Sequence, residues 1–229
     1  MDYASFLKNV PLFASLKPTD LDNLARITKV NKYKKGDSIF HQADPGSTLY
    51  IIASGQVKIT VISPEGDEII LAILTDGDFF GELSLLDQHP RSANVVTMMD
   101  TQAIVLHQHD LLNFLSTHPE LAIDIMAELS RRLREANTAL EDAVFLNLPT
   151  RLAKRLLELG QKHGVKTDRG IELGLHLTQQ DLADMVGASR VAVNKQLKMF
   201  KIKGLIDAYK RQLIITRPEE LGKYTDVLE

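Results

Sequence analysis

Residues 30–108 consist of short segments in which apolar and polar residues alternate and β-branched side chains are frequent. Glycines that can form turns stand at positions 36, 46, 55, 66 and 77, in steps of 9 to 11 residues. This spacing is typical of short strands joined by tight turns. We therefore expect a β-sandwich, jelly roll or small barrel, with strands in the segments DSIFHQ, TLYIIASG, QVKITVIS, EIILAIL, SANVVTM and TQAIVLHQ. A helix is expected before them, at KPTDLDNLARIT.

Residues 119–147 have no glycine or proline in their interior, and their apolar residues recur at steps of four and three. This pattern predicts a helix of about 40 Å with a coiled-coil type seam. A second apolar flank indicates that the helix contacts both its own β-domain and the same helix of a second protomer. The seam is Ala122, Met126, Leu129, Leu133, Ala136, Leu140 and Ala143, and the flank is Leu121, Ile125 and Val144.

The remaining chain predicts a helix at 151–164, a short strand near 171–177, helices at 178–186 and 189–203, and a final pair of strands. The two adjacent helices have the signals of a helix-turn-helix. Thr178 is the expected N-cap of the first helix and Ser189 that of the second, and Gly187 permits the sharp turn between them. Inward-facing residues are expected to be Leu182, Ala183, Val186, Val193, Leu197 and Phe200.

Positive charge is unevenly distributed along the chain. Residues 1–149 hold 12 Lys and Arg against 20 Asp and Glu, whereas residues 150–229 hold 15 against 10. A charge run is usually a solvated face, but a basic end on an acidic body favours a polyanion partner. Within residues 189–217, Asp207 alone opposes Arg190, Lys195, Lys198, Lys201, Lys203, Lys210, Arg211 and Arg217.

Several classes of protein are excluded or disfavoured by composition. The absence of cysteine excludes disulfides, thiolate zinc sites and cysteine-ligated iron–sulfur clusters. No stretch approaches the roughly 18 consecutive apolar residues of a membrane span, and the start does not resemble a signal peptide. We expect a cytoplasmic protein without a membrane partner. No nucleophile–base pairing, metal-ligand cluster or Walker-type loop indicates an enzyme.

The segment 79–96, FFGELSLLDQHPRSANVV, places an acid, Glu82, nine residues before an arginine, Arg91. A bound phosphate needs a fixed cation, hydroxyl donors and free backbone N–H groups. Arg91, Ser92 and the amides of a turn beginning near Leu83–Ser84 could supply them, and Glu82 could accept from a sugar hydroxyl of the same ligand. The alternative, equally compatible with the spacing, is a surface salt bridge between Glu82 and Arg91.

Three segments resemble parts of one family. FGELSLLDQHPRSANVV resembles the phosphate-binding cassette of cyclic-nucleotide-binding domains, and GSTLYIIASGQVKIT resembles the strand-and-turn stretch of the same fold. LTQQDLADMVGASRVAVNKQLK resembles the helix-turn-helix of the Crp/Fnr family of bacterial transcription regulators, whose cAMP receptor branch the chain resembles. The matches cover nearly the whole chain in the family's order.

The resemblance implies that Glu82 meets a ribose hydroxyl and that Arg91 and Ser92 hold a cyclic phosphate. Members that bind cAMP have Thr followed by Ser or Asn on the long helix, where this chain has Ala136-Asn137. Asn137 can still reach a purine edge, whereas Ala136 has no group to do so. The implied effector is cAMP or another cyclic nucleotide, with no metal. The predicted ligand site is Gly81, Glu82, Leu83, Ser84, Arg91, Ser92, Ala93 and Asn137.

The second helix of the helix-turn-helix departs from the family's common pattern, Ser-Arg-Glu-Thr-Val-x-Arg, because this chain has SRVAVNK. Arg190 keeps the ability to bind guanine, whereas Val191 replaces a carboxylate that accepts from cytosine and offers a methyl contact to thymine. The predicted DNA-contacting residues are Thr178, Gln179, Gln180, Ser189, Arg190, Val191, Asn194, Lys195 and Lys198.

The expected fold is α+β, with a jelly-roll (β-roll) sensor at 1–118, a dimerisation helix at 119–147 and a winged helix-turn-helix domain at 148–229. The resemblance implies a homodimeric regulator, not an enzyme, that binds a palindromic operator, contacts RNA polymerase and responds to a small ligand between the β-roll and the long helix. Alternatives with the same fold are a constitutive DNA binder and a sensor of 2-oxoglutarate or haem. The scattered histidines, with His107 and His109 at strand spacing, disfavour haem.

Overall fold

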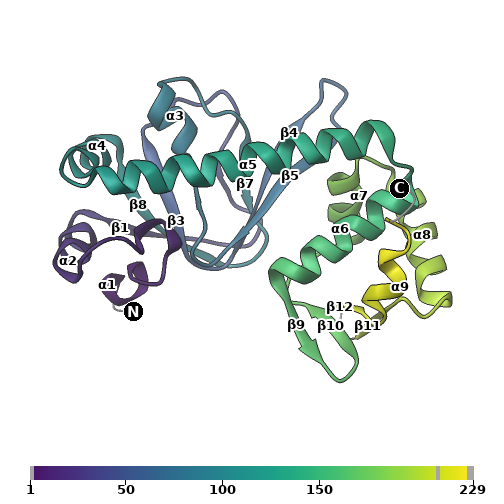
Figure 1. Cartoon of the computed structure of the whole chain (residues 1–229). Coiled ribbons are helices and arrows are strands. Elements are labelled where there is room, and N and C mark those ends of the chain that lie inside the picture. Colours follow the sequence, from purple (N-terminus) through teal and green to yellow (C-terminus); the bar gives the residue numbers. More distant parts are fainter. Residues whose placement is uncertain (1–2, 210–211, 226–229) are drawn as a thin grey trace. The chain divides into compact units, whose positions relative to one another are not determined.

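The computed structural model describes residues 3–209 and 212–225 (Figure 1). They form two compact units, Met1–Asp67 with Leu71–Glu135, and Ala136–Glu229 with Glu68–Ile70. The long helix α5 (Pro119–Phe145) contributes to both units. It begins at the residue predicted from the sequence and ends at Phe145, within the predicted range.

The first unit is a β-roll of two four-stranded antiparallel sheets, which is among the β-folds that the glycine spacing predicted and is the fold that the family resemblance implied. The sheet orders are β1-β8-β3-β6 and β2-β7-β4-β5. The strands are β1 (Lys29–Tyr33), β2 (Ser38–Phe40), β3 (Thr48–Ser54), β4 (Gln56–Ile62), β5 (Glu68–Thr75), β6 (Phe79–Phe80), β7 (Asn94–Thr97) and β8 (Thr101–His107). The helices before α5 are α1 (Tyr3–Leu7), the 3-10 helix η1 (Pro11–Phe13), α2 (Pro18–Ile27), α3 (Glu82–Asp87) and α4 (Gln108–Thr117).

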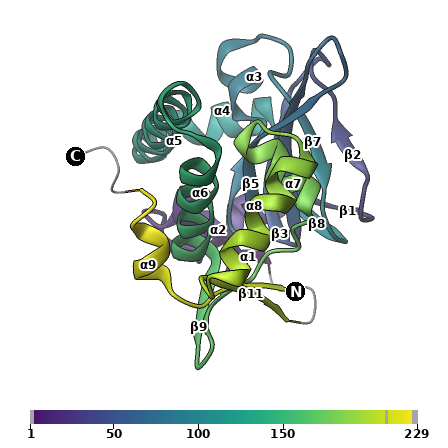
Figure 2. The ribbon, with the colours of Figure 1, turned by 90° about the vertical axis from the view of Figure 1, so that its right-hand side faces the viewer.

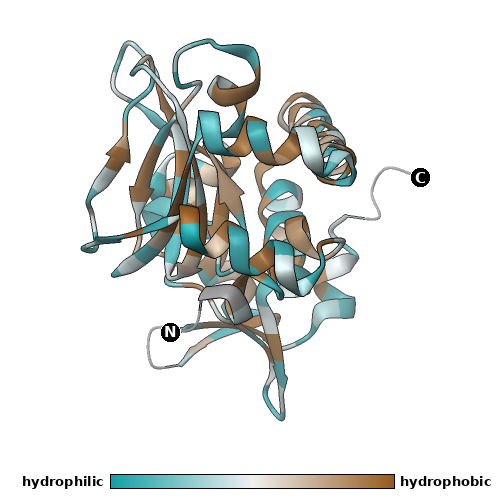
Figure 3. Cartoon of the chain, turned by 90° about the vertical axis from the view of Figure 1, so that its left-hand side faces the viewer, coloured by the Kyte–Doolittle hydropathy of each residue, from teal (hydrophilic) through white to brown (hydrophobic). Residues whose placement is uncertain are grey.

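Alternation along β3 divides the core of this unit into two clusters. Leu49 and Ile51 face a cluster that includes Leu121 and Ile125 of α5, so the N-terminal part of that helix is packed on the first sheet. Ile52 points the other way, into a second cluster inside the roll. Because successive side chains of a strand point to opposite faces, one strand can serve both clusters. Figure 3 shows the apolar residues, in brown, interspersed with polar ones along the strands and helices.

The second unit is a helical domain with a four-stranded antiparallel sheet of order β11-β12-β10-β9 (Figure 2). The predicted helices and final strand pair are present, and β9 and α9 are additional. The elements are α6 (Leu148–His163), β9 (Gly164–Thr167), β10 (Gly170–Leu173), α7 (Gln179–Val186), α8 (Arg190–Ile202), β11 (Ile206–Tyr209), β12 (Gln212–Ile215) and α9 (Pro218–Gly222).

The strand predicted across TQAIVLHQ is correct only as far as His107. The chain turns into α4 at Gln108, so His109 lies on a helix and the predicted strand spacing of the two histidines is wrong. The N-cap of α4, His107, makes no side-chain capping bond, so no capping residue marked this boundary in the sequence. Among the described residues, no helix combines the length and the hydropathy of a membrane span.

Candidate nucleotide-binding and DNA-binding sites

The segment that carries Arg91 is fixed to a neighbouring loop by its backbone. The Arg91 N–H donates to the carbonyl of Asp44 at 2.8 Å, and the Arg91 carbonyl accepts from the Ala43 N–H at 2.9 Å. The side chain is 4% exposed. Arg91 is therefore an interior residue of the β-roll, not a surface arginine.

The guanidinium of Arg91 is held by neutral acceptors. Nη1 donates to the Gly81 carbonyl at 2.8 Å and to Ser84 Oγ at 3.2 Å, and Nη2 donates to the Thr48 carbonyl at 3.0 Å and to Thr48 Oγ1 at 2.8 Å. The Phe40 ring centroid lies 4.2 Å from Cζ, which adds a cation–π contact. Among the described residues Arg91 has no salt-bridge partner, and its buried Nε has no acceptor. Burial lowers the pKa of this guanidinium.

Two glycines make room for this arrangement. Gly81 has φ +86°, and a Cβ there would lie 2.8 Å from both Arg91 Nη1 and the Thr48 carbonyl oxygen. A Cβ on Gly46 would lie 2.6 Å from Arg91 Nε. Both contacts are too short for any side chain, so the guanidinium requires glycine at both positions.

Glu82 and Arg91 do not form the salt bridge that was the alternative interpretation of their spacing. Glu82 is 5% exposed and pairs instead with Arg132 of α5, whose Nη1 lies 3.2 Å from Glu82 Oε1. Arg132 also donates from Nη2 to the Phe79 carbonyl at 2.7 Å and from Nε to Glu128 at 2.8 Å. Burial raises the pKa of Glu82, and the charge of Arg132 opposes that rise.

The remaining predicted ligand residues lie in different environments. Ser84 and Ala93 are buried, whereas Leu83 is 43% exposed. The Ser92 side chain is exposed and, within the described part of the chain, makes no hydrogen bond. Asn137 is an exposed residue of α5 that belongs to the second unit. The structure thus brings Gly81, Ser84 and Arg91 into direct contact, with Glu82 adjacent in sequence.

The helix-turn-helix has the predicted caps. Thr178 Oγ1 accepts from the Asp181 N–H at 3.1 Å, and the Asp181 carboxylate accepts from the Thr178 N–H at 2.8 Å, which completes a capping box. Gly187, at φ +60°, ends α7, and Ser189 Oγ accepts from the Ala192 N–H at 3.2 Å to begin α8. These caps and the left-handed glycine between the helices are the features expected of a helix-turn-helix.

The faces of α8 are divided as predicted. Val193, Leu197 and Phe200 are buried, whereas Arg190, Lys195 and Lys198 are exposed, and Val191 is 81% exposed. Asn194, also predicted to face outward, is half-buried. Within residues 3–209 and 212–225, these three cations form no salt bridge. At the end of α7, Arg151 of α6 donates to the Val186 carbonyl at 3.1 Å. Lys210 and Arg211, part of the predicted basic run, lie outside the described residues.

Three residues of the nucleotide-site cluster were missed by sequence reasoning. Thr48 lies in the segment GSTLYIIASGQVKIT, but nothing in its spacing marked it as an acceptor for Arg91. Phe40 was assigned to a strand without a role. The spacing of Arg132 from Glu128 predicts an ion pair along the helix, but nothing in the sequence marked Arg132 as the partner of Glu82.

Comparisons with known proteins agree with this organisation. A family model described as "Cyclic nucleotide-binding domain" matches residues 30–118, and one described as "Crp-like helix-turn-helix domain" matches residues 150–224.

A CRP-like cAMP-activated global transcriptional regulator of Mycobacterium tuberculosis is 34% identical over 95% of this chain and 97% of its own length. The cyclic AMP receptor protein of Thermus thermophilus is 34% identical over 87% of this chain and 89% of its own. The c-di-GMP responsive regulator CLP of Xanthomonas campestris shares the fold, with a TM-score of 0.76 and 23% identity over 87% of this chain and 99% of its own. The chain therefore belongs to the Crp/Fnr family of DNA-binding transcription regulators, which are not enzymes, and carries a cyclic nucleotide-binding domain and a Crp-like helix-turn-helix.

Proposed function

We propose that this protein is a homodimeric transcription regulator whose affinity for a palindromic operator is controlled by a cyclic nucleotide. We propose cAMP as that nucleotide. One observation carries the proposal. The guanidinium of Arg91 is 4% exposed and has no carboxylate partner among the described residues. Glu82 and Asp44 act on this cation through their charges, without a salt bridge to it. A buried cation whose direct hydrogen-bond acceptors are all neutral is costly unless an anion completes it. A phosphate supplies that anion, because the N–H groups of a guanidinium form charge-assisted hydrogen bonds with phosphate oxygens.

Each polar group of the site has a place in this proposal. Arg91 and Ser92 would hold the cyclic phosphate, because Arg91 Nε lacks an acceptor and the Ser92 hydroxyl is exposed. Glu82 would accept from the ribose hydroxyl, in competition with Arg132. Asn137 would bind the purine edge. Because Arg132 lies on α5, a ligand that alters the pairing of Glu82 acts on the helix that enters the second unit.

The choice of cAMP rests on relatives whose names describe them as cAMP-activated or cyclic AMP receptors. Ala136 weakens that choice, because it has no hydroxyl where cAMP-binding members have Thr. The named relative CLP responds to c-di-GMP, so another effector on the same fold is the alternative. A 2-oxoglutarate sensor, a haem sensor or a constitutive DNA binder would leave the Arg91 site without its proposed nucleotide.

The dimer is proposed from an apolar stripe on α5. Met126, Leu133 and Leu140 recur every seven residues and are 57%, 63% and 66% exposed. Val144, of the predicted flank, is 65% exposed. Leu121 and Ile125 are buried on the β-roll instead. An exposed apolar stripe at heptad spacing on a single long helix favours pairing with a second copy of that helix. A dimer would also place two copies of α8 for the two half-sites of a palindrome, about 34 Å apart.

For DNA, we propose that the N-terminal turn of α8 enters the major groove. Arg190 would bind guanine, and Val191 would contact a thymine methyl. Gln179, Gln180 and Ser189 would contact phosphates and thereby position the helix. We also propose RNA polymerase as a protein partner, as the family resemblance implies.

Isothermal calorimetry of the full-length protein with cAMP, cGMP, c-di-GMP and 2-oxoglutarate tests the effector. We expect cAMP to bind to the wild type, and R91A to bind it at least about a hundredfold more weakly, because a charge-assisted pair is lost. R190A is the matched control, since it removes an exposed arginine that belongs to the DNA face. Equal cAMP binding by R91A and R190A would contradict the assigned pocket. Tighter binding of another compound would replace cAMP as the effector.

A further inference from the structure

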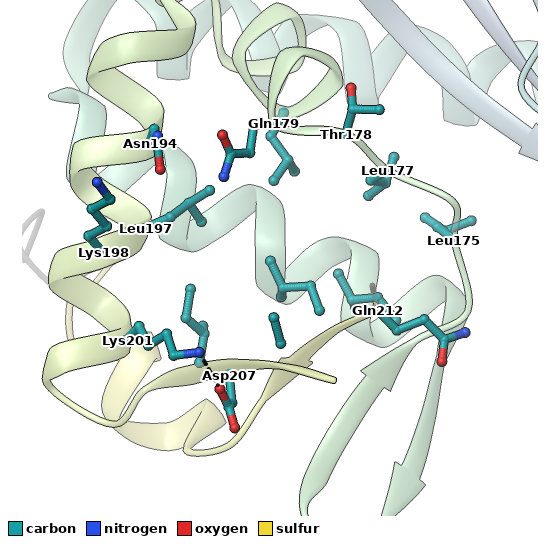
Figure 4. Close-up of a pocket in the computed structure, with 15 residues that line it drawn as sticks. Leu175, Leu177, Thr178, Gln179, Asn194, Leu197, Lys198, Lys201, Asp207 and Gln212 are labelled. Atoms are coloured by element: carbon teal, nitrogen blue, oxygen red, sulfur yellow. Dashed lines mark ion pairs between the residues drawn. The ribbon is translucent and has the colours of Figure 1, made fainter. Parts of the chain in front are cut away.

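The second unit contains a cavity that the nucleotide site does not explain. It has a volume of about 360 Å³ and lies between α8, the β11–β12 hairpin and the segment that leads into α7 (Figure 4). This volume falls in the range of small-molecule sites. Aliphatic side chains form most of its interior, among them Leu173, Leu175, Leu182, Leu197, Ile206 and Leu213.

The chemistry of the lining favours a hydrocarbon chain over a nucleobase. No aromatic side chain is among the lining residues that the structure describes, so these residues offer no ring on which a base could stack. Four of the leucines named above, Leu173, Leu175, Leu182 and Leu197, are buried, and all belong to the domain's own core. Methylene groups that enter such a cavity leave water and contact only carbon, which is favourable in proportion to their area.

The polar border of the cavity favours a negatively charged head group. Lys198, Asn194 and Gln179 line it, and none of their side chains has a hydrogen-bonding or ionic partner among the residues that the structure describes. The other lysine at the border, Lys201, is already paired with Asp207 at 2.8 Å. An unpaired ammonium beside two amides and an aliphatic interior is complementary to a carboxylate with an apolar tail.

We propose that this cavity is a second ligand site, which binds a monocarboxylic acid with an aliphatic chain of about ten carbons. The carboxylate pairs with Lys198, and the chain lies among the leucines. Gln179, Asn194 and Lys198 are also proposed DNA contacts, so the acid and the operator compete for the same groups. This competition rests on the proposed DNA contacts, whereas binding of the acid does not. The acid therefore acts as an antagonist of DNA binding, independently of the β-roll.

Calorimetric titration of decanoate into the full-length protein, below the micelle concentration, tests the site directly. Decyltrimethylammonium has the same chain with the opposite charge, and propionate has the carboxylate without the chain. We expect decanoate to bind saturably and both controls to bind at least about tenfold more weakly. Absence of saturable decanoate binding, or equal binding of decyltrimethylammonium, overturns the proposal.

Two matched variants locate the binding. Ala208 is exposed on β11 and lines the cavity, so A208F fills the cavity without touching a proposed DNA contact. Val165 is 62% exposed on β9 and does not line the cavity, so V165F is the control. We expect decanoate affinity to fall about tenfold in A208F and to stay unchanged in V165F. Equal affinities in the two variants overturn the proposal.

The variant K198Q provides a second test that does not depend on filling the cavity. Lys198 is exposed, so its substitution leaves the domain folded. Decanoate should bind K198Q more weakly, with binding of decyltrimethylammonium unchanged. An unaltered decanoate affinity contradicts the assigned head-group contact.

Competition with DNA is measured separately, by adding decanoate to a complex of the protein with labelled operator. We expect DNA to be released from the wild type and V165F but retained by A208F. Decanoate that binds without releasing DNA supports the ligand site and overturns the competition. Failure of the protein to bind operator DNA even at saturating cAMP would contradict the proposed function instead, and the calorimetric result would stand.

Discussion

At the scale of single residues, Arg91 connects three parts of the β-roll: the loop at Ala43–Asp44, the start of β3 at Thr48 and the start of α3 at Gly81. The same guanidinium that is proposed to hold a phosphate therefore holds the ligand-free fold. The surface salt bridge expected as the alternative would have contributed little. Because the guanidinium is buried and hydrogen-bonded, its removal is expected to lower the stability of the fold.

R91A should accordingly reduce stability as well as ligand binding. Loss of the side chain removes its hydrogen bonds to the Gly81 and Thr48 carbonyls, which we expect to lower the free energy of unfolding by about 1–3 kcal/mol. Urea unfolding of ligand-free protein measures this, with R190A as the exposed control that should change it by less than about 0.5 kcal/mol. An R91A protein as stable as R190A would show that other groups satisfy those carbonyls.

Glu82 gives a pH-dependent prediction. Burial raises the pKa of Glu82 in the folded protein, so the group takes up a proton on folding, and stability falls as the pH rises from the unfolded pKa through the folded pKa. In R132Q the opposing cation is lost, so this window extends to higher pH. R132Q should have a lower free energy of unfolding than the wild type. We expect this difference to be about 1–2 kcal/mol larger at about pH 7.5 than at about pH 5.

The double variant E82Q/R132Q is the control for this pH effect. Without the carboxyl, the difference between the two pH values should disappear in urea unfolding experiments. If the free energy of unfolding depends on pH in the same way for R132Q and for the double variant, Glu82 is not the titrating group.

At the scale of elements, α5 is predicted to be the dimer contact through its exposed stripe. L140K places a charge in that stripe, whereas T138K places the same charge at an exposed position on another face of the helix. Because burying an unpaired ammonium is unfavourable, we expect the dimer dissociation constant of L140K to rise by about a hundredfold or more. Sedimentation velocity measures it. A dimer equally stable in both variants would exclude this stripe as the interface.

The reading helix α8 gives a prediction about sequence preference. With Val191 exposed at its N-terminal turn, we expect selection from random DNA to yield a palindrome with one guanine per half-site and a T·A preference where a Glu would select cytosine. V191E should shift that position toward cytosine, with discrimination of about 1–3 kcal/mol. Cytosine dependence already present in the wild type would refute this account of α8.

At the scale of the whole molecule, the two faces of α5 were predicted only in part, because Leu129 of the predicted seam packs against the β-roll core and Val144 of the predicted flank is 65% exposed. The order of α7 and α8 and the buried face of α8 were predicted, because their periodicity and caps are local signals. Thr178, Gly187 and Ser189 act as predicted for this reason. The short strand β6 and helix α4 were missed, because Phe79–Phe80 is too short to show alternation and α4 has no capping side chain. Contacts across long separations, such as Arg91 with Thr48 and Glu82 with Arg132, have no local signal at all.

The proposed function requires coupling between the Arg91 site and operator DNA, and thermodynamic linkage makes this coupling reciprocal. The most direct measurement is the affinity of the full-length protein for a labelled palindromic duplex, by fluorescence anisotropy, with and without saturating cAMP. We predict that cAMP tightens DNA binding by about tenfold or more, that the duplex tightens cAMP binding by the same factor, and that R91A shows neither effect. Equal DNA affinity of the wild type with and without cAMP would contradict the account.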